Sequence, residues 1–315
     1  MRRASFYIGA IVLGTIGPFA LASLALEVVS VQRTNAEYDA LLASGVGAWF
    51  GLLGALAVLG LLVAAVESRT MASAILGGRY ANRPVGARRA LARSRMVFWH
   101  AIVASIIVSI PVTIAQQLVN GVLEGALGGQ AEASLVTSTL VAAIVGAPFA
   151  YVLAGVVLGD VDPFEATRRS FRVFRARKLA AAVVALFETV AVLLVALGLG
   201  AGLDIALRVF DALGLGADSG PAGLALIALG TVVGVFAFGT LIYTALAISL
   251  APQVVMFVGL TRATIGLDHV RPGGDQDPAA PPIPHRPFHW LTIPMRLGMI
   301  VGVIGIVAIL AIAAE

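Results

Sequence analysis

Residues 162–178 read DPFEATRRSFRVFRARK, and this charged stretch lies between two long apolar runs. Asp162 can cap a helix, Pro163 suits its first turn, and Glu165 stands where a capping box would be completed. At 100° per residue, three phenylalanines share one side of the helix and three arginines share another: Phe164, Phe171, Phe174 and Arg168, Arg169, Arg172. The pattern predicts an amphipathic helix at a membrane surface, with the chain crossing the bilayer before and after it.

The composition of the whole chain agrees with a membrane protein. Apolar residues make up 59% and charged residues 12%, whereas a soluble domain is about a quarter charged. Runs of roughly twenty apolar residues predict an all-α, polytopic helical membrane protein. The expected spans are about 5–29, 46–66, 96–119, 135–158, 179–201, 222–250 and 297–314.

The basic residues alternate between the segments that connect these spans. Of the 21 lysines and arginines, all except Arg33 and Arg208 fall in alternate segments that would share one side of the membrane. Because positive charge is retained inside, the N-terminus is expected to be cytoplasmic and the C-terminus outside. The net charge of +4 therefore indicates topology and anionic lipid as a partner, and not nucleic acid.

Residues 222–260 are long enough for two short spans, but their middle has no polar turn. Two spans would also place Arg262 and the following arginines outside. We therefore expect one long helix, kinked near Pro252. The expected domains are a six-span membrane body at 1–270, a Pro-rich inner linker at 271–290 and a C-terminal span at 291–315.

A faint internal repeat relates two of the charged segments. Four residues of the first recur 79 positions later: Pro84, Ala87, Arg89 and Arg93 correspond to Pro163, Ala166, Arg168 and Arg172. Each set follows one span and precedes the next. The spacing predicts a duplicated unit in which a surface helix leads into a pair of spans, as in some transporters.

The stretch Asp162–Ser170 resembles a known family. It is similar to the inner-loop pattern of the membrane domain fused to glycerophosphoryl diester phosphodiesterases, and to that of related six-span bacterial proteins of unknown function. Ala251-Pro252 in the last helix of the body, followed by Arg262, is also similar. The resemblance covers about 1–270 and implies a bacterial inner-membrane location. The phosphodiesterase domain itself has no counterpart here, so its catalysis is not carried over.

Glu188 is expected to be the only acidic residue well inside a span. An ionised carboxylate there costs about 2.5–3.5 kcal/mol on insertion scales, so we expect an uncharged side chain. It would either bond across a helix interface or serve as a proton relay or ligand acceptor. Gln116 and Tyr151 are the other intramembrane polar candidates, either lining a cavity with Glu188 or lying at kinks and interfaces.

Three glycine pairs have the spacing that lets helices approach closely: Gly155/Gly159, Gly230/Gly234 and Gly298/Gly302. The last pair, on the isolated C-terminal span, predicts a homo-oligomer or a membrane partner. His285 and His289 stand four apart, but the intervening Pro287 opposes a helix, so no metal site is expected.

Motifs of soluble-type catalysis or cofactor binding do not occur in the sequence. We therefore expect a non-enzymatic protein without a cofactor, with no catalytic residues to name. The favoured role is a lipid-associated scaffold or accessory module that binds anionic headgroups at Arg168, Arg172 and Arg175. The alternative is a permease for a small or amphiphilic substrate that uses Glu188.

Overall fold

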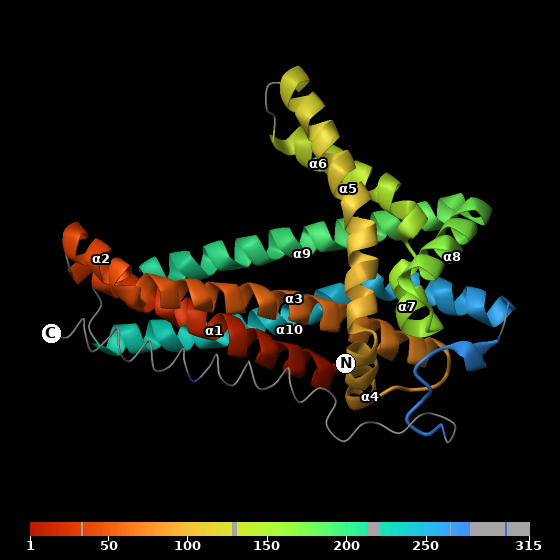
Figure 1. Ribbon diagram of the computed structural model, residues 1–315, viewed down its shortest axis with the longest axis horizontal. Coiled ribbons are helices and arrows are strands. Elements are labelled where there is room, and N and C mark those ends of the chain that lie inside the picture. The colour runs from red at the N-terminus through yellow and green to blue at the C-terminus, as the bar shows by residue number, and fades with distance from the viewer. Residues whose placement is uncertain (33, 128–130, 213–220, 265, 278–299, 301–315) are drawn as a thin grey trace. The chain divides into compact units, whose positions relative to one another are not determined.

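The computed structural model describes residues 1–32, 34–127, 131–212, 221–264, 266–277 and 300, and the part of the chain so described is all-α without a strand (Figure 1). The α-helices are α1 (Arg2–Gln32), α2 (Asn35–Leu41), α3 (Gly47–Tyr80), α4 (Ala87–Met96), α5 (Phe98–Leu127), α6 (Ala131–Gly146), α7 (Val152–Gly159), α8 (Pro163–Ala176), α9 (Lys178–Ala212) and α10 (Pro221–Thr264). A π-helical turn joins α2 to α3, and 3-10 turns follow α6 and α10.

Six stretches of the described helices are long and apolar enough to cross a membrane. They are Arg2–Ser30, Gly47–Tyr80, Phe98–Val122, Val136–Gly159, Lys178–Gly202 and Ala222–Thr264. These match six of the seven predicted spans and make the chain a multi-pass membrane protein. The seventh predicted span, at 297–314, lies outside the described residues.

Three of the described helices are longer than the spans predicted from hydropathy. α10 is a single helix of 44 residues, which confirms one helix where two short spans were the alternative. α3 has 34 residues and α9 has 35. At 1.5 Å per residue these three are about 66, 51 and 53 Å long, against a hydrocarbon thickness of about 30 Å. In the last turns of α9, Arg208 pairs with Asp204 at 2.9 Å.

The described residues form two compact units, and three helices contribute to both. The first unit falls within Val66–Ala196 and Thr244–Pro287 together with Met1, and the second within Arg2–Ala65 and Leu197–Tyr243. In the second unit, glycines hold helices together. A Cβ built on Gly239 would come within 2.8 Å of the Gly9 Cα, and one on Gly60 would collide with Thr15. Helix α1 therefore packs closely on α10 and α3.

The first unit is built around a broken span. Pro148 follows the end of α6, where its ring and missing N–H stop an α-helix, and a 3-10 turn (Ala147–Phe149) leads into α7. Helix α6 folds back on α5 (Figure 1). A core cluster of Ala150, Tyr151, Ala181 and Val184 lies where the break meets α9.

Residues 266–277, which follow α10, pack against the connection between α3 and α4. The Asp275 carboxylate accepts from the Gly86 N–H at 2.7 Å and from the Arg89 Nε at 3.1 Å. Arg83 pairs with Asp268 and lies 3.7 Å from Asp277. The start of the segment predicted to be a flexible linker is therefore bonded to the body. The rest of that linker, from 278, lies outside the described residues.

Candidate functional site

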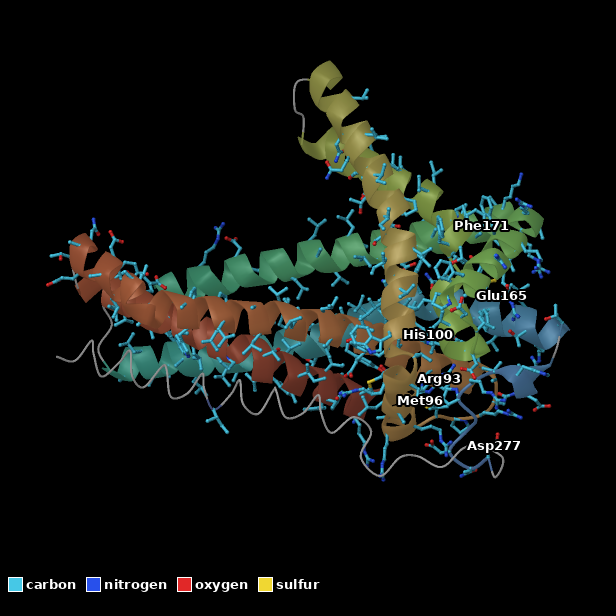
Figure 2. The ribbon with its side chains drawn as sticks, in the orientation of Figure 1. Arg93, Met96, His100, Glu165, Phe171 and Asp277 are labelled. Atoms are coloured by element: carbon cyan, nitrogen blue, oxygen red, sulfur yellow. The ribbon has the colours of Figure 1, made fainter. Side chains whose placement is uncertain are left out.

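Helix α8 begins as the sequence predicts. The Asp162 carboxylate accepts a hydrogen bond from the Phe164 N–H at 3.0 Å, and Pro163 opens the helix. Glu165 does not complete the expected capping box but accepts a hydrogen bond from the Arg169 Nε at 2.9 Å. This bond, aided by the charges of nearby arginines, lowers the pKa of the Glu165 carboxyl. Figure 2 shows Glu165 and Phe171 on this helix.

The phenylalanines of α8 have three different surroundings. Phe164 is 64% exposed, Phe171 packs edge-on against Phe149 with ring centroids 5.1 Å apart, and Phe174 packs on the core cluster that contains Tyr151. Phe174 is therefore packed against the protein, although it was predicted to share one side of the helix with Phe164 and Phe171. Phe174 lies next to the buried face of α8. Helical periodicity alone does not distinguish a face that packs on protein from one that faces lipid.

Ser170 fastens α8 to the broken span. Its hydroxyl donates to the Pro148 carbonyl at 2.6 Å and accepts from the Tyr151 N–H at 3.2 Å. The break leaves both backbone groups without helical partners, and Ser170 satisfies them. Pro163 and Ala166 are buried on the same face.

The three arginines predicted to bind headgroups all lie on exposed positions of α8. Arg172 differs from Arg168 and Arg175 because it also lines a pocket. Among the described residues, none of the three forms an ion pair with a carboxylate. The exposed side of α8 is therefore cationic, while its buried side is fixed to the protein.

The pocket has a volume of about 720 Å³ and lies among α7, α8, the end of α10 and residues 269–271. Its cationic lining residues are Arg169, Arg172 and Arg271, with His269 beside them. Tyr151 also lines the pocket and is only 3% exposed. Within the described part of the chain its hydroxyl has no hydrogen-bond partner.

Glu188 joins three helices. Its carboxylate accepts from the guanidinium of Arg69 on α3 and from the side-chain amide of Gln253 on α10. The uncharged carboxyl that the sequence favoured is therefore replaced by an ion pair, because Arg69 belongs to helix α3 and not to a solvated loop. Arg69, Glu188 and Gln253 each lie 10 or 11 residues from the nearer end of their helices. The three side chains therefore form one charged level at a similar height along α3, α9 and α10.

A second intramembrane acid escaped the sequence reasoning. Glu67 is 0% exposed within the candidate span Gly47–Tyr80, and it pairs with Arg95 of α4, which is 3% exposed. The hydroxyls of Thr70 and Ser94 lie 2.5 Å apart in the same seam. The expectation that Glu188 is the only acid inside a span is wrong, since the second span was ended one residue before Glu67. The pairing of an acid and a basic residue 28 positions apart carried no sequence signal.

Arg93 of α4 has a structural role as well. Its guanidinium donates to the carbonyls of Val157 at 2.9 Å and Val156 at 3.2 Å, and lies 2.8 Å from the Asp160 carboxylate. These carbonyls belong to the last turn of α7, which has no helical donors for them. Figure 2 labels Arg93 on α4. Arg172, which corresponds to Arg93 in the internal repeat, lines a pocket instead. Corresponding positions of the two segments therefore have different contacts.

The remaining candidates are separated. The Gln116 amide donates to the Ser138 carbonyl at 3.2 Å and joins α5 to α6. Gln116 and Glu188 thus bond to different partners, and the pocket that Tyr151 lines beside α8 is not lined by either of them. A Cβ on Gly155 would lie 3.2 Å from Ala166 Cβ, which accounts for the close approach of α7 and α8.

The other glycines of the predicted pairs behave differently. A Cβ on Gly159 would lie 3.2 Å from the Phe257 ring, whereas one on Gly234 would meet no atom of the described residues within 4 Å. The packing expected at Gly234 is therefore not observed among the described residues. Gly230, four residues earlier, is half-buried. Gly298 and Gly302 lie outside the described residues, as do His285 and His289. Within the described ranges, acids and histidines do not gather into a metal-binding group.

No family model, curated protein or solved structure matches this chain. The resemblance to the membrane domain of glycerophosphoryl diester phosphodiesterases stays a prediction.

Proposed function

We propose that this protein is a non-enzymatic, lipid-associated scaffold or accessory module of the bacterial inner membrane, with its N-terminus cytoplasmic and its C-terminus outside. The observation that carries the proposal is the two-sided character of α8. Pro163, Ala166 and Ser170 are buried against the protein, while Arg168, Arg172 and Arg175 are exposed. A cationic helix fixed in this way is suited to hold anionic headgroups beside the spans.

The strength of the attraction follows from the number of charges. Each arginine near an anionic leaflet contributes about 1 kcal/mol, so three that act independently contribute about 3 kcal/mol. The exposed Phe164 adds a ring that can enter the interface at the start of the helix.

The test is the triple variant R168Q/R172Q/R175Q. Arg177 and Lys178 remain, so enough positive charge is left to keep the topology. We expect the purified variant to carry less phosphatidylglycerol and cardiolipin, relative to phosphatidylethanolamine, than the natural protein does by lipid mass spectrometry. An unchanged lipid profile in the folded variant would contradict the proposal. These arginines would then serve only to set the membrane topology.

The second candidate, a permease, is favoured by the charged level of Arg69, Glu188 and Gln253, because charged residues inside spans often mark transport pathways. A transport pathway would admit water to this level. In the cysteine-free chain, reaction of T189C with a small water-soluble thiol reagent would support transport. Protection of T189C, with A176C reacting as a positive control, would support the scaffold.

A further inference from the structure

The pocket beside α8 has the features of a built ligand site and not of a bare charged surface. It is enclosed by segments that are far apart in the sequence: the end of α7, one face of α8, the last turns of α10 and residues 269–271. Phe257, Leu260 and Val173 supply apolar wall, and Arg172 and Arg271 supply charge. A ligand that fills it must therefore have both an anionic and an apolar part.

The charges of the pocket are not balanced by its own acids. Arg169 is engaged by Glu165 at 2.9 Å, and Asp160 is engaged by Arg93 at 2.8 Å. Arg172 and Arg271 form no ion pair with any carboxylate of the described residues. Two guanidiniums thus remain to bind an external anion, and guanidinium groups bind phosphate oxygens in a bidentate manner.

Arg271 is held at the pocket by its own backbone. Its N–H donates to the Leu158 carbonyl at 2.8 Å, at the end of α7, and the preceding Val270 is buried. Further along, Asp275 is bonded to Gly86 and Arg89. The position of this arginine is therefore fixed from both sides and does not depend on a loose linker.

Tyr151 gives an independent indication of a ligand. Its ring is buried in the core cluster, the residue lines the pocket, and its buried hydroxyl has no partner among the described residues. Buried hydroxyls are almost always hydrogen-bonded, so an acceptor supplied by a ligand would complete this one. The Tyr151 N–H bonds the Ser170 hydroxyl, and Val173 and Phe174 pack on its cluster. Tyr151 therefore lies beside the part of α8 that carries Arg172.

We propose that this pocket binds the phosphate group of an anionic phospholipid, with Arg172 and Arg271 on the phosphate and the Tyr151 hydroxyl donating to another oxygen of the same molecule. The inference rests on the proposed lipid association and makes it specific, since it places one headgroup in a defined site. A free phosphate ester shares the anionic chemistry but would leave the apolar wall without contacts.

The experiment measures binding of three probes to the purified full chain in detergent by isothermal titration calorimetry. The probes are dihexanoyl phosphatidylglycerol, dihexanoyl phosphatidylcholine and inorganic phosphate. The variants are Y151F, R172Q and R271Q, with R262Q as the control, because Arg262 is exposed near the end of α10 but does not line the pocket. Y151F removes only the hydroxyl and keeps the buried ring and the net charge.

We expect phosphatidylglycerol to bind more tightly than phosphatidylcholine. Y151F should weaken phosphatidylglycerol binding about fivefold, as loss of one hydrogen bond does, and R172Q or R271Q about tenfold or more. R262Q should change it less than twofold. Inorganic phosphate that binds as tightly as phosphatidylglycerol, with the same order of variants, would keep the site but assign it to free phosphate.

Two results would overturn the site. One is that phosphatidylglycerol does not bind to the natural protein. The other is that Y151F and R271Q bind it as tightly as R262Q does. If the latter occurs while R168Q/R172Q/R175Q still loses anionic lipid, the surface proposal survives and only the pocket fails. Should Y151F reduce thermal stability, R271Q, outside the helices, decides the outcome by itself.

Discussion

At the scale of single residues, the arginines of this chain divide into two groups that the sequence does not distinguish. Arg69, Arg93 and Arg95 are bonded inside the protein, whereas Arg168 and Arg175 are exposed. The count of positive charges on each side of the membrane treats all of them alike. Whether an arginine is exposed depends on partners distant in the sequence, which hydropathy does not report.

The buried pair of Glu67 and Arg95 should show this difference in stability. R95M leaves the Glu67 carboxylate buried without its partner and should destabilise the protein by about 3–5 kcal/mol, while the double variant E67L/R95M should recover most of the loss. Unfolding in detergent followed by circular dichroism measures both. R208Q, which breaks an exposed pair with Asp204, is the control and should cost no more than about 1 kcal/mol. A double variant as unstable as R95M would contradict the pairing.

At the scale of elements, the sequence predicted most ends of the six described spans to within a few residues. The reason is that the hydrophobic run that inserts a helix is a local property. The start of α8 and its Asp162 cap were also predicted. Sequence reasoning missed the extension of α3 past Glu67 and the docking of residues 266–277. Helix–helix contacts and ion pairs decide both, and neither has a local pattern.

The attachment of α8 to the broken span depends on Ser170. S170A would leave the Pro148 carbonyl and the Tyr151 N–H without the partner that satisfies them, so we expect a cost of about 1–3 kcal/mol. Hydrogen exchange measured by mass spectrometry should rise in peptides that cover residues 147–152.

T167A is the matched control for this change. Thr167 donates only to the Pro163 carbonyl within its own helix at 2.8 Å, an interaction that adds little to helix stability. Equal exchange in S170A and T167A would show that the Ser170 bonds do not hold the two segments together.

At the scale of the whole molecule, the proposed topology is tested by asking which loops share a side of the membrane. With one crossing for each of the six candidate spans, this proposal puts residue 263 on the same side as α8 and opposite to residue 40. Because the chain has no cysteine, A40C, A176C and A263C each introduce a unique label, and all three positions are exposed. We expect an impermeant thiol reagent to label A40C in intact cells, and A176C and A263C only after lysis. Labelling of A263C in intact cells would contradict the proposed topology.

The ion pair between Arg69 and Glu188 spans 119 positions of sequence, and this separation has a consequence for biosynthesis. A ribosome that adds about 5–20 residues per second needs roughly 6–24 s to pass from one residue to the other. Throughout that interval the membrane-insertion machinery handles a guanidinium whose eventual carboxylate has not been synthesised. Glu67, by contrast, meets Arg95 after only 28 more residues. The two charged seams are therefore assembled in succession: the α3–α4 seam is available first, and the level shared with α9 and α10 is closed only after Gln253 has been synthesised.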